Sequence, residues 1–290
     1  MRTLVSGPVS ANPVSPSPVS ASLPVAVVQL SSQDDVPANL ACATHWVGEA
    51  ARAGAKLVAL PENFAFMGEE VDKRNAAEQV GEGAISKALA AAARAHHVFI
   101  VAGGMPEKSA DPDRPYNTSL LFAPSGEVIA KYRKIHLFDV DLPDGTKLQE
   151  SRATLEGPVE IGELPSVGPA LLGMTVCYDL RFPELYRALA AKGARIVTVP
   201  AAFTLTTGKD HWHVLLRARA IEDQVFVLAP AQTGKHPKGR QTYGKSLIID
   251  PWGDVLAQCG EGEGFALARL DFAYQDRVRG SLPSLRHQRM

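Results

Sequence analysis

The chain has 290 residues, 46% of them hydrophobic and 21% charged, a composition typical of a globular protein with a well-filled core. Its 30 basic and 31 acidic residues leave a net charge of −1 and form no polybasic block, so we expect neither nucleic acid nor a membrane surface as a partner. No apolar run reaches the roughly 18–20 residues that span a bilayer.

Residues 1–23 repeat a Pro-Val-Ser triplet and have little to bury, so we predict a disordered tail, followed by one domain over residues 24–290. The prolines also break any apolar core of a signal peptide. The three cysteines, Cys42, Cys177 and Cys259, are widely spaced and form no CxxC pair. This pattern does not favour a disulfide framework, and we therefore expect a reducing cytoplasm.

From Val25 onward, short apolar runs alternate with amphipathic stretches, which is typical of a layered α/β or α+β domain. In chain order we predict a strand over residues 25–30, a helix over 38–53, a strand over 57–60, a helix over 85–95, strands over 98–102, 118–122, 128–132 and 170–176, a helix over 183–192, a strand over 195–200, a helix over 211–223, and strands over 225–229, 245–249, 255–258 and 265–270. The turns Pro124-Ser-Gly126 and Pro251-Trp-Gly253 predict hairpins, so antiparallel pairs are expected in the same sheets.

The first candidate for chemistry is Glu62, which follows the strand of residues 57–60 and Pro61. Phe64 and Phe66 would shield its carboxylate from water. Desolvation raises the pKa of a carboxyl group, so we expect Glu62 to serve as a general base. The alternative is a structural carboxylate in a turn.

The second candidate is Lys134, which lies in a basic segment but is followed by Ile135, Leu137 and Phe138. A solvated basic face is the simpler interpretation of such a cluster. The apolar neighbours nevertheless indicate that part of the segment is buried, and a buried lysine needs a carboxylate or a developing anion beside it.

The third candidate is Cys177, where an apolar strand meets a polar turn and a helix begins near Phe182. A sharp turn of this kind exposes the sulfur and directs backbone N–H groups toward an oxyanion. The alternative is a small buried hydrophobe. Cys42 and Cys259 lack such a turn, and we interpret them as structural.

Together the three groups indicate a mechanism that needs neither metal nor cofactor. A lysine cation lowers the pKa of a neighbouring thiol, and a glutamate can take the thiol proton. After Cys177 attacks an amide carbonyl, Lys134 and the N–H of Tyr178 would hold the oxyanion. Glu62 would then protonate the leaving amine and activate water against the thioester.

The chain resembles the nitrilase superfamily of carbon–nitrogen hydrolases in three motifs that occur in the family's order. These motifs are Leu60-Pro-Glu-Asn-Phe64, Tyr132-Arg-Lys-Ile-His-Leu-Phe-Asp139 and Val176-Cys-Tyr-Asp-Leu-Arg-Phe-Pro-Glu-Leu185. The resemblance implies an α-β-β-α sandwich that dimerises into a four-layer sandwich. It also implies that Glu62 is the general base, Lys134 the oxyanion-stabilising lysine, Cys177 the nucleophile and Glu150 an auxiliary glutamate that orients its neighbours.

Within this superfamily the segments 216–222, 231–236 and 243–246 resemble the branch that hydrolyses deaminated glutathione, whereas 137–141 and 205–208 resemble the ω-amidases, which act on 2-oxoglutaramate. Both branches hydrolyse an amide of a 2-oxo-dicarboxylic acid, so a cation must meet a substrate carboxylate. Arg181 is the candidate because a guanidinium grips a carboxylate with two hydrogen bonds. A structural ion pair of Arg181 with Glu184 or Asp179 is the alternative.

Four other interpretations stay open from the sequence. A papain-type hydrolase would use His136, His211 or His213 as its base, and His211 with His213 could suggest a metal pair. His211 and His213 are two residues apart on a predicted helix, however, and would point to different faces. A non-catalytic scaffold of the same fold and a nitrile hydrolase complete the alternatives.

Overall fold

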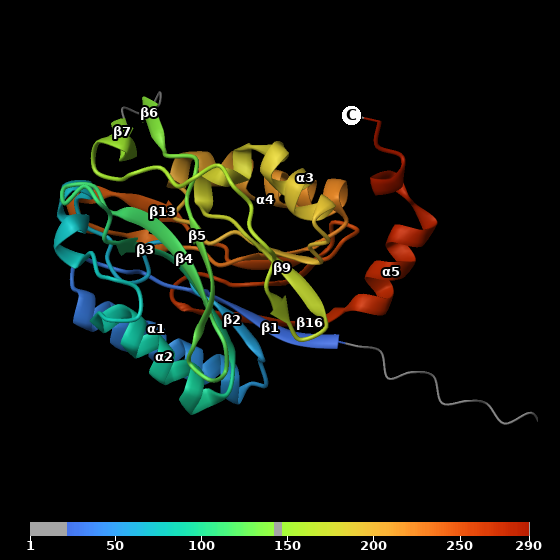
Figure 1. The fold of residues 1–290 in the computed structure, drawn as a ribbon, viewed down its shortest axis with the longest axis horizontal. Helices are drawn as coiled ribbons and strands as arrows, with labels where there is room; N and C mark the ends of the chain where they lie inside the picture. The colour runs from blue at the N-terminus through green and yellow to red at the C-terminus, as the bar shows by residue number, and fades with distance from the viewer. Residues whose placement is uncertain (1–21, 142–146, 290) are drawn as a thin grey trace, which may run out of the picture.

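The computed structural model describes residues 22–141 and 147–289, and in this part of the chain two six-stranded sheets pack face to face. Helices cover the outer face of each sheet, so the layers follow the order α-β-β-α (Figure 1). The predicted sandwich is confirmed. The predicted tail over residues 1–23 lies outside the described residues except for Ser22 and Leu23, which begin the first strand.

The first sheet has the strand order β16-β1-β2-β3-β4-β5. Its strands are β1 (Ser22–Gln29), β2 (Leu57–Ala59), β3 (Phe99–Glu107), β4 (Tyr116–Phe122), β5 (Val128–Arg133) and β16 (Gly264–Asp271). Strands β1, β2 and β3 run parallel and are joined by α1 (Val36–Arg52) and α2 (Ala84–His96), which lie side by side on the outer face (Figure 1). Strands β4, β5 and β16 pair antiparallel with their neighbours.

The second sheet repeats this plan in the order β15-β14-β11-β10-β9-β8. Its strands are β8 (Ser166–Val167), β9 (Ala170–Met174), β10 (Ile196–Thr198), β11 (Phe226–Ala229), β14 (Leu247–Ile249) and β15 (Val255–Gln258). Parallel strands β9, β10 and β11 are joined by α3 (Pro183–Ala191) and α4 (Leu205–Asp223), and the hairpin β14–β15 follows. Each half therefore has the chain order β-α-β-α-β-β-β.

Smaller elements decorate the two sheets. They are the hairpins β6 (Asp139–Asp141)–β7 (Lys147–Gln149) and β12 (Thr233–Lys235)–β13 (Gln241–Tyr243), the helix α5 (Phe272–Ser281), and the 3-10 helices η1 (Glu70–Ala76), η2 (Glu150–Arg152), η3 (Cys177–Arg181), η4 (Pro237–Gly239) and η5 (Ser284–Arg286). None of the helices in the described ranges is long and apolar enough to cross a membrane.

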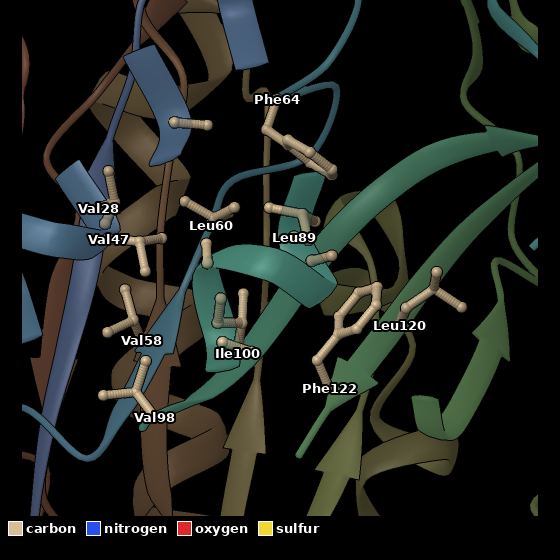
Figure 2. Packing of buried hydrophobic residues seen from close by; sticks show 14 of the residues in the cluster. Val28, Val47, Val58, Leu60, Phe64, Leu89, Val98, Ile100, Leu120 and Phe122 are labelled. Atoms are coloured by element: carbon tan, nitrogen blue, oxygen red, sulfur yellow. The ribbon is translucent and has the colours of Figure 1, made fainter. Parts of the chain in front are cut away.

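The parallel strands are buried on both faces, which explains their continuous apolar sequences. Successive side chains alternate: in β2, Leu57 and Ala59 face the second sheet, whereas Val58 packs toward α1 and α2. Figure 2 shows part of this helix-side cluster, which includes Val47 of α1 together with Val58 and Ile100 of the sheet. Apolar side chains are buried at the three interfaces between the four layers. At roughly 25 cal/mol per Å² of apolar surface removed from water, this burial is the main source of the folded state's stability.

Two helices differ from the prediction. Helix α4 begins at Leu205, six residues before the predicted start at residue 211, because the hydroxyl of Thr204 accepts a hydrogen bond from the N–H of Thr207 and caps the helix. Helix α5 was not predicted. It contains few apolar residues, and polar side chains tie it to the sandwich: Gln275 bonds to Arg195 and to the backbone of Gln224.

Candidate active site

The three predicted reactive groups come together at one end of the sandwich. Glu62 follows β2, Lys134 follows β5 and Cys177 follows β9, so each lies just beyond the end of a strand. They are only 3%, 2% and 9% exposed, respectively. All three line one cavity, which Glu150, Tyr178 and Arg181 also line.

The Lys134 ammonium lies between two buried carboxylates. Its Nζ is 3.0 Å from Oε1 of Glu62, and it is 3.1 and 2.8 Å from Oε1 and Oε2 of Glu150. The amide of Asn117 on β4 donates to Oε1 of Glu62 and to Oε1 of Glu150, at 2.9 and 3.2 Å. The N–H of Phe138 donates to Oε2 of Glu150 at 2.7 Å, which fixes the second carboxylate.

Asn117 was missed by the sequence reasoning. Its signal was a carboxamide near the start of a strand, where asparagine is normally depleted. Glu150, in contrast, was named from the sequence, and in the structure its carboxylate bonds to Lys134.

Cys177 occupies a tight turn between β9 and η3. Its φ of 49° lies in the left-handed region, which costs a non-glycine residue roughly 1–2 kcal/mol. Its N–H donates to the carbonyl of Pro200 at 2.8 Å, and the buried carboxylate of Asp179 accepts from the N–H of Val176 at 2.8 Å. The turn predicted from the sequence is therefore present, and these bonds hold it in its strained form.

The two sheets approach each other closely beside this turn. A Cβ added to Gly103 on β3 would lie 2.1 Å from Cβ of Pro200, so only glycine permits the approach. As a result Oε2 of Glu62, from the first sheet, accepts the N–H of Ala202, from the second, at 3.1 Å. The Cys177 thiol lines the same cavity as Glu62 and Ala202, close enough for both groups to influence its pKa.

The charges of the cluster set its protonation. Burial raises the pKa of the Cys177 thiol well above its usual range, and the Glu62 carboxylate raises it further, while Lys134 opposes both without outweighing them. Burial also disfavours the ionised form of Glu62, but Lys134 and Lys73 outweigh it and hold the pKa of Glu62 below its usual value. For Lys134, burial lowers the pKa, but Glu150 and Glu62 prevail and raise it well above the usual range.

The resting site therefore contains a neutral thiol, an ionised carboxylate and an ammonium group. Two sequence predictions were wrong in direction: the pKa of Glu62 is lowered rather than raised, and the pKa of Cys177 is raised rather than lowered. The causes differ. At Glu62 the cations Lys134 and Lys73 outweigh burial, whereas at Cys177 burial and the ionised Glu62 carboxylate outweigh Lys134.

Tyr178 is the second residue of η3, and an N–H in the first turn of a helix has no intrahelical partner. Cys177 and Asp179, its neighbours, direct their N–H groups to Pro200 and Val176. The backbone at Tyr178 thus offers a donor next to the sulfur.

Arg181 lines the cavity at the end of η3. Its guanidinium lies over the rings of Phe203 and Tyr178, at 5.4 and 5.9 Å from the ring centres, and Nη1 is 3.3 Å from Nδ1 of His211. Within residues 22–141 and 147–289 no ion pair joins Arg181 to a carboxylate. The alternative of a structural ion pair with Glu184 or Asp179 is therefore wrong for the described residues.

The histidines of the papain-type alternative lie elsewhere. Nδ1 of His136 contacts Asp179 at 2.7 Å, and Nε2 of His213 contacts Gln258 at 2.7 Å. None of the cavity-lining residues in the described ranges is a histidine. The same part of the chain contains no cluster of three or more His, Cys, Asp or Glu side chains that could hold a metal ion.

Known proteins share this fold and sequence. The profile of the carbon–nitrogen hydrolase family matches residues 24–279. A deaminated glutathione amidase of Synechocystis sp. (strain PCC 6803) is 46% identical over 264 residues, which cover 91% of this chain and 97% of that protein. The crystal structure of Saccharomyces cerevisiae Nit3, a member of branch 10 of the nitrilase superfamily, has a TM-score of 0.80 and 33% identity and covers 91% of this chain and 95% of Nit3.

An amidase from Nesterenkonia sp. AN1, solved as a variant with acrylamide added to its active-site cysteine, has a TM-score of 0.75 and 29% identity over 90% of this chain and 98% of that one. These likenesses confirm the resemblance seen in the three sequence motifs. They also confirm the prediction of an enzyme that hydrolyses an amide. The chain belongs to the carbon–nitrogen hydrolase family.

Proposed function

We propose that the protein hydrolyses deaminated glutathione through a thioester on Cys177. The observation that carries this proposal is that the buried Cys177 thiol lines one cavity with the Glu62 carboxylate, which bonds to the Lys134 ammonium at 3.0 Å. The Synechocystis relative bears the name of this activity and is similar over nearly its whole length. A complete cluster, in which Lys134 bonds to both buried carboxylates, also argues against a non-catalytic scaffold.

In the first half-reaction the Cys177 proton passes to Glu62 while the sulfur attacks the amide carbonyl. Because the proton stays inside the cluster, its net charge does not change, and no isolated thiolate is needed. Lys134 and the N–H of Tyr178 stabilise the tetrahedral oxyanion. As the C–N bond breaks, the Glu62 carboxyl gives its proton to the leaving amine, and the acyl group remains on sulfur as a thioester.

The second half-reaction reverses these roles. Glu62 takes a proton from water, and the hydroxyl adds to the thioester carbonyl. Collapse of this adduct releases the carboxylic acid, and the sulfur recovers a proton from Glu62. Glu150 touches neither sulfur nor carbonyl in this scheme: it is a positioning residue that orients Lys134.

Arg181 supplies the charge that recognises the acyl part of the substrate. It is a cavity cation without a carboxylate partner among the described residues, so a substrate carboxylate can accept two hydrogen bonds from its guanidinium. The amides of 2-oxo-dicarboxylic acids carry such a carboxylate at the far end of the acyl chain.

We further propose a homodimer in a reducing compartment such as the cytoplasm, where free thiols persist. Val214 and Ile221 on α4 are 67% and 45% exposed, and Trp252, in the neighbouring β14–β15 turn, is 53% exposed. These residues offer an apolar face around which the second sandwich of the four-layer assembly can pack.

The proposed function predicts a substrate preference. Purified protein should show a kcat/KM at least about tenfold higher for deaminated glutathione than for 2-oxoglutaramate, equivalent to about 1.4 kcal/mol in the transition state. Cys177→Ala should retain its fold by circular dichroism but lose turnover of both amides. The opposite preference would identify an ω-amidase, and near-normal activity of Cys177→Ala would contradict the mechanism.

The charge state predicts an unusual pH profile. Because the pKa of Glu62 is lowered from about 4.5, its carboxylate is available at all higher pH values, and activity should fall only below about pH 4.5. Because the pKa of Cys177 is raised above 9, no thiolate forms at neutral pH. We expect kcat/KM to vary less than about twofold between pH 6 and 8. A steep rise over this interval, which tracks thiolate formation, would contradict the assignment.

Arg181→Gln should reduce kcat/KM for deaminated glutathione by about 30-fold or more, mainly through KM, because the substrate carboxylate loses a charged partner worth roughly 2 kcal/mol. Lys209→Gln, which removes an exposed cation of α4, is the control and should change kcat/KM less than about twofold. Equal KM values for Arg181→Gln and the unmodified protein would rule out the carboxylate role.

The dimer can be tested by sedimentation. The unmodified protein should sediment as a dimer, and Val214→Glu should sediment as a monomer because a charge replaces an apolar contact. Val159→Glu is the control, since Val159 is 87% exposed and far from α4 in the sequence. A dimer that survives Val214→Glu would place the interface elsewhere.

A further inference from the structure

A second ionic cluster lines the same cavity as Cys177. The carboxylate of Glu70 lies 2.7 Å from Nζ of Lys73 and 2.9 Å from Nη1 of Arg240. Burial raises the pKa of Glu70, but Lys73 and Arg240 outweigh it and bring the pKa to about 2. Glu70 is therefore ionised at any working pH. Two cations share one carboxylate, and the cluster keeps one net positive charge.

Arg240 lies at the boundary between two spaces. It lines the inner cavity that holds Cys177, and it also lines an outer groove together with Glu69, Lys147 and Pro237. Arg181, in contrast, lines the inner cavity and not the groove. The two arginines come from different segments of the chain: Arg181 ends η3, and Arg240 lies between η4 and β13.

The Arg240 guanidinium keeps a donor available for a ligand. One of its nitrogens, Nη1, bonds to Glu70, while its Nε is buried and has no hydrogen-bond partner within the described residues. The side chain is 21% exposed, so it is held in place yet reachable. Because Glu70 satisfies this guanidinium only in part, its remaining N–H groups can donate to a bound anion.

The chemistry of the reaction says which anion belongs there. During acylation the acyl part stays in the inner cavity on Cys177, and the leaving amine must depart toward the open groove. Deaminated glutathione carries one carboxylate on its acyl part and a second on the glycine of its leaving dipeptide. 2-Oxoglutaramate has only the first, because its leaving group is ammonia.

We propose that Arg240 binds the carboxylate of the leaving amine. It would make the protein selective for amides whose amine part is a peptide with a free C-terminal carboxylate. This inference rests on the proposed function and adds a second carboxylate site to it. Arg181 would hold the acyl carboxylate and Arg240 the amine carboxylate, one positive charge for each. Electrostatic complementarity of this kind produces specificity between substrates that react by the same chemistry.

The test uses two substrates that differ only at this carboxylate: deaminated glutathione and its analogue with a C-terminal glycinamide. For the unmodified protein, kcat/KM should be at least tenfold higher for the free acid than for the amide. In Arg240→Gln this ratio should fall to about two or less. Arg240→Lys keeps the positive charge but loses the paired N–H groups of the guanidinium, so it should give an intermediate ratio. This variant also keeps an ion pair with Glu70, and it replaces Arg240→Gln in the test if the glutamine variant folds poorly.

Lys235→Gln is the matched control, because it removes one exposed cation from the same β12–β13 hairpin without touching either space. Its ratio should remain at least tenfold. A ratio near one for the unmodified protein, or an unchanged ratio in Arg240→Gln, would overturn the role of Arg240 while leaving the proposed function intact. Failure to hydrolyse either substrate, with turnover of 2-oxoglutaramate, would instead overturn the proposed function.

Discussion

The burial of the Lys134 ammonium between Glu62 and Glu150 is the constraint on which the rest of the site depends. An unpaired ammonium in this position would cost several kcal/mol, so the chain must deliver both carboxylates to it. Glu62 comes from the end of β2, Glu150 from η2 and Lys134 from the end of β5. The cluster thus ties the edge of the first sheet to the segment that leads into the second half of the molecule. Asn117 bridges the two carboxylates and holds them at a fixed separation.

The same cluster explains how a buried cysteine with a raised pKa can be a nucleophile. Two carboxylates and one ammonium leave a net charge of one negative unit, and a thiolate beside them would add a second negative charge. Transfer of the thiol proton to Glu62 avoids this, because the negative charge only moves from oxygen to sulfur. The oxyanion that follows lies near the ammonium and the Tyr178 backbone donor, which are already in place and need no reorganisation. Activity then depends on preorganised charge rather than on a free thiolate.

Much of this arrangement could be predicted from the sequence because it depends on local patterns. Apolar runs of four to six residues marked most strands of both sheets, and a polar residue at the end of such a run marked Glu62, Lys134 and Cys177. The pKa directions could not be predicted, since they depend on the distances among groups that lie 72 and 16 residues apart. The same holds for Glu70 and Arg240, which are 170 residues apart and meet only in the folded chain. Helix α5 was not predicted because only a few apolar residues, Phe272 and Val278 among them, are buried in it, and much of its attachment comes from the hydrogen bonds of Gln275.

The covalent thioester is the central claim, and partitioning with hydroxylamine tests it most directly. Deaminated glutathione and 2-oxoglutaramate have the same acyl group and different leaving amines, so both must form the same acyl-enzyme on Cys177. In the presence of hydroxylamine, the ratio of hydroxamate to free acid should therefore be identical for the two amides, whichever step limits the rate. A ratio that depends on the leaving amine would mean that water or hydroxylamine attacks the amide directly, and it would contradict the account.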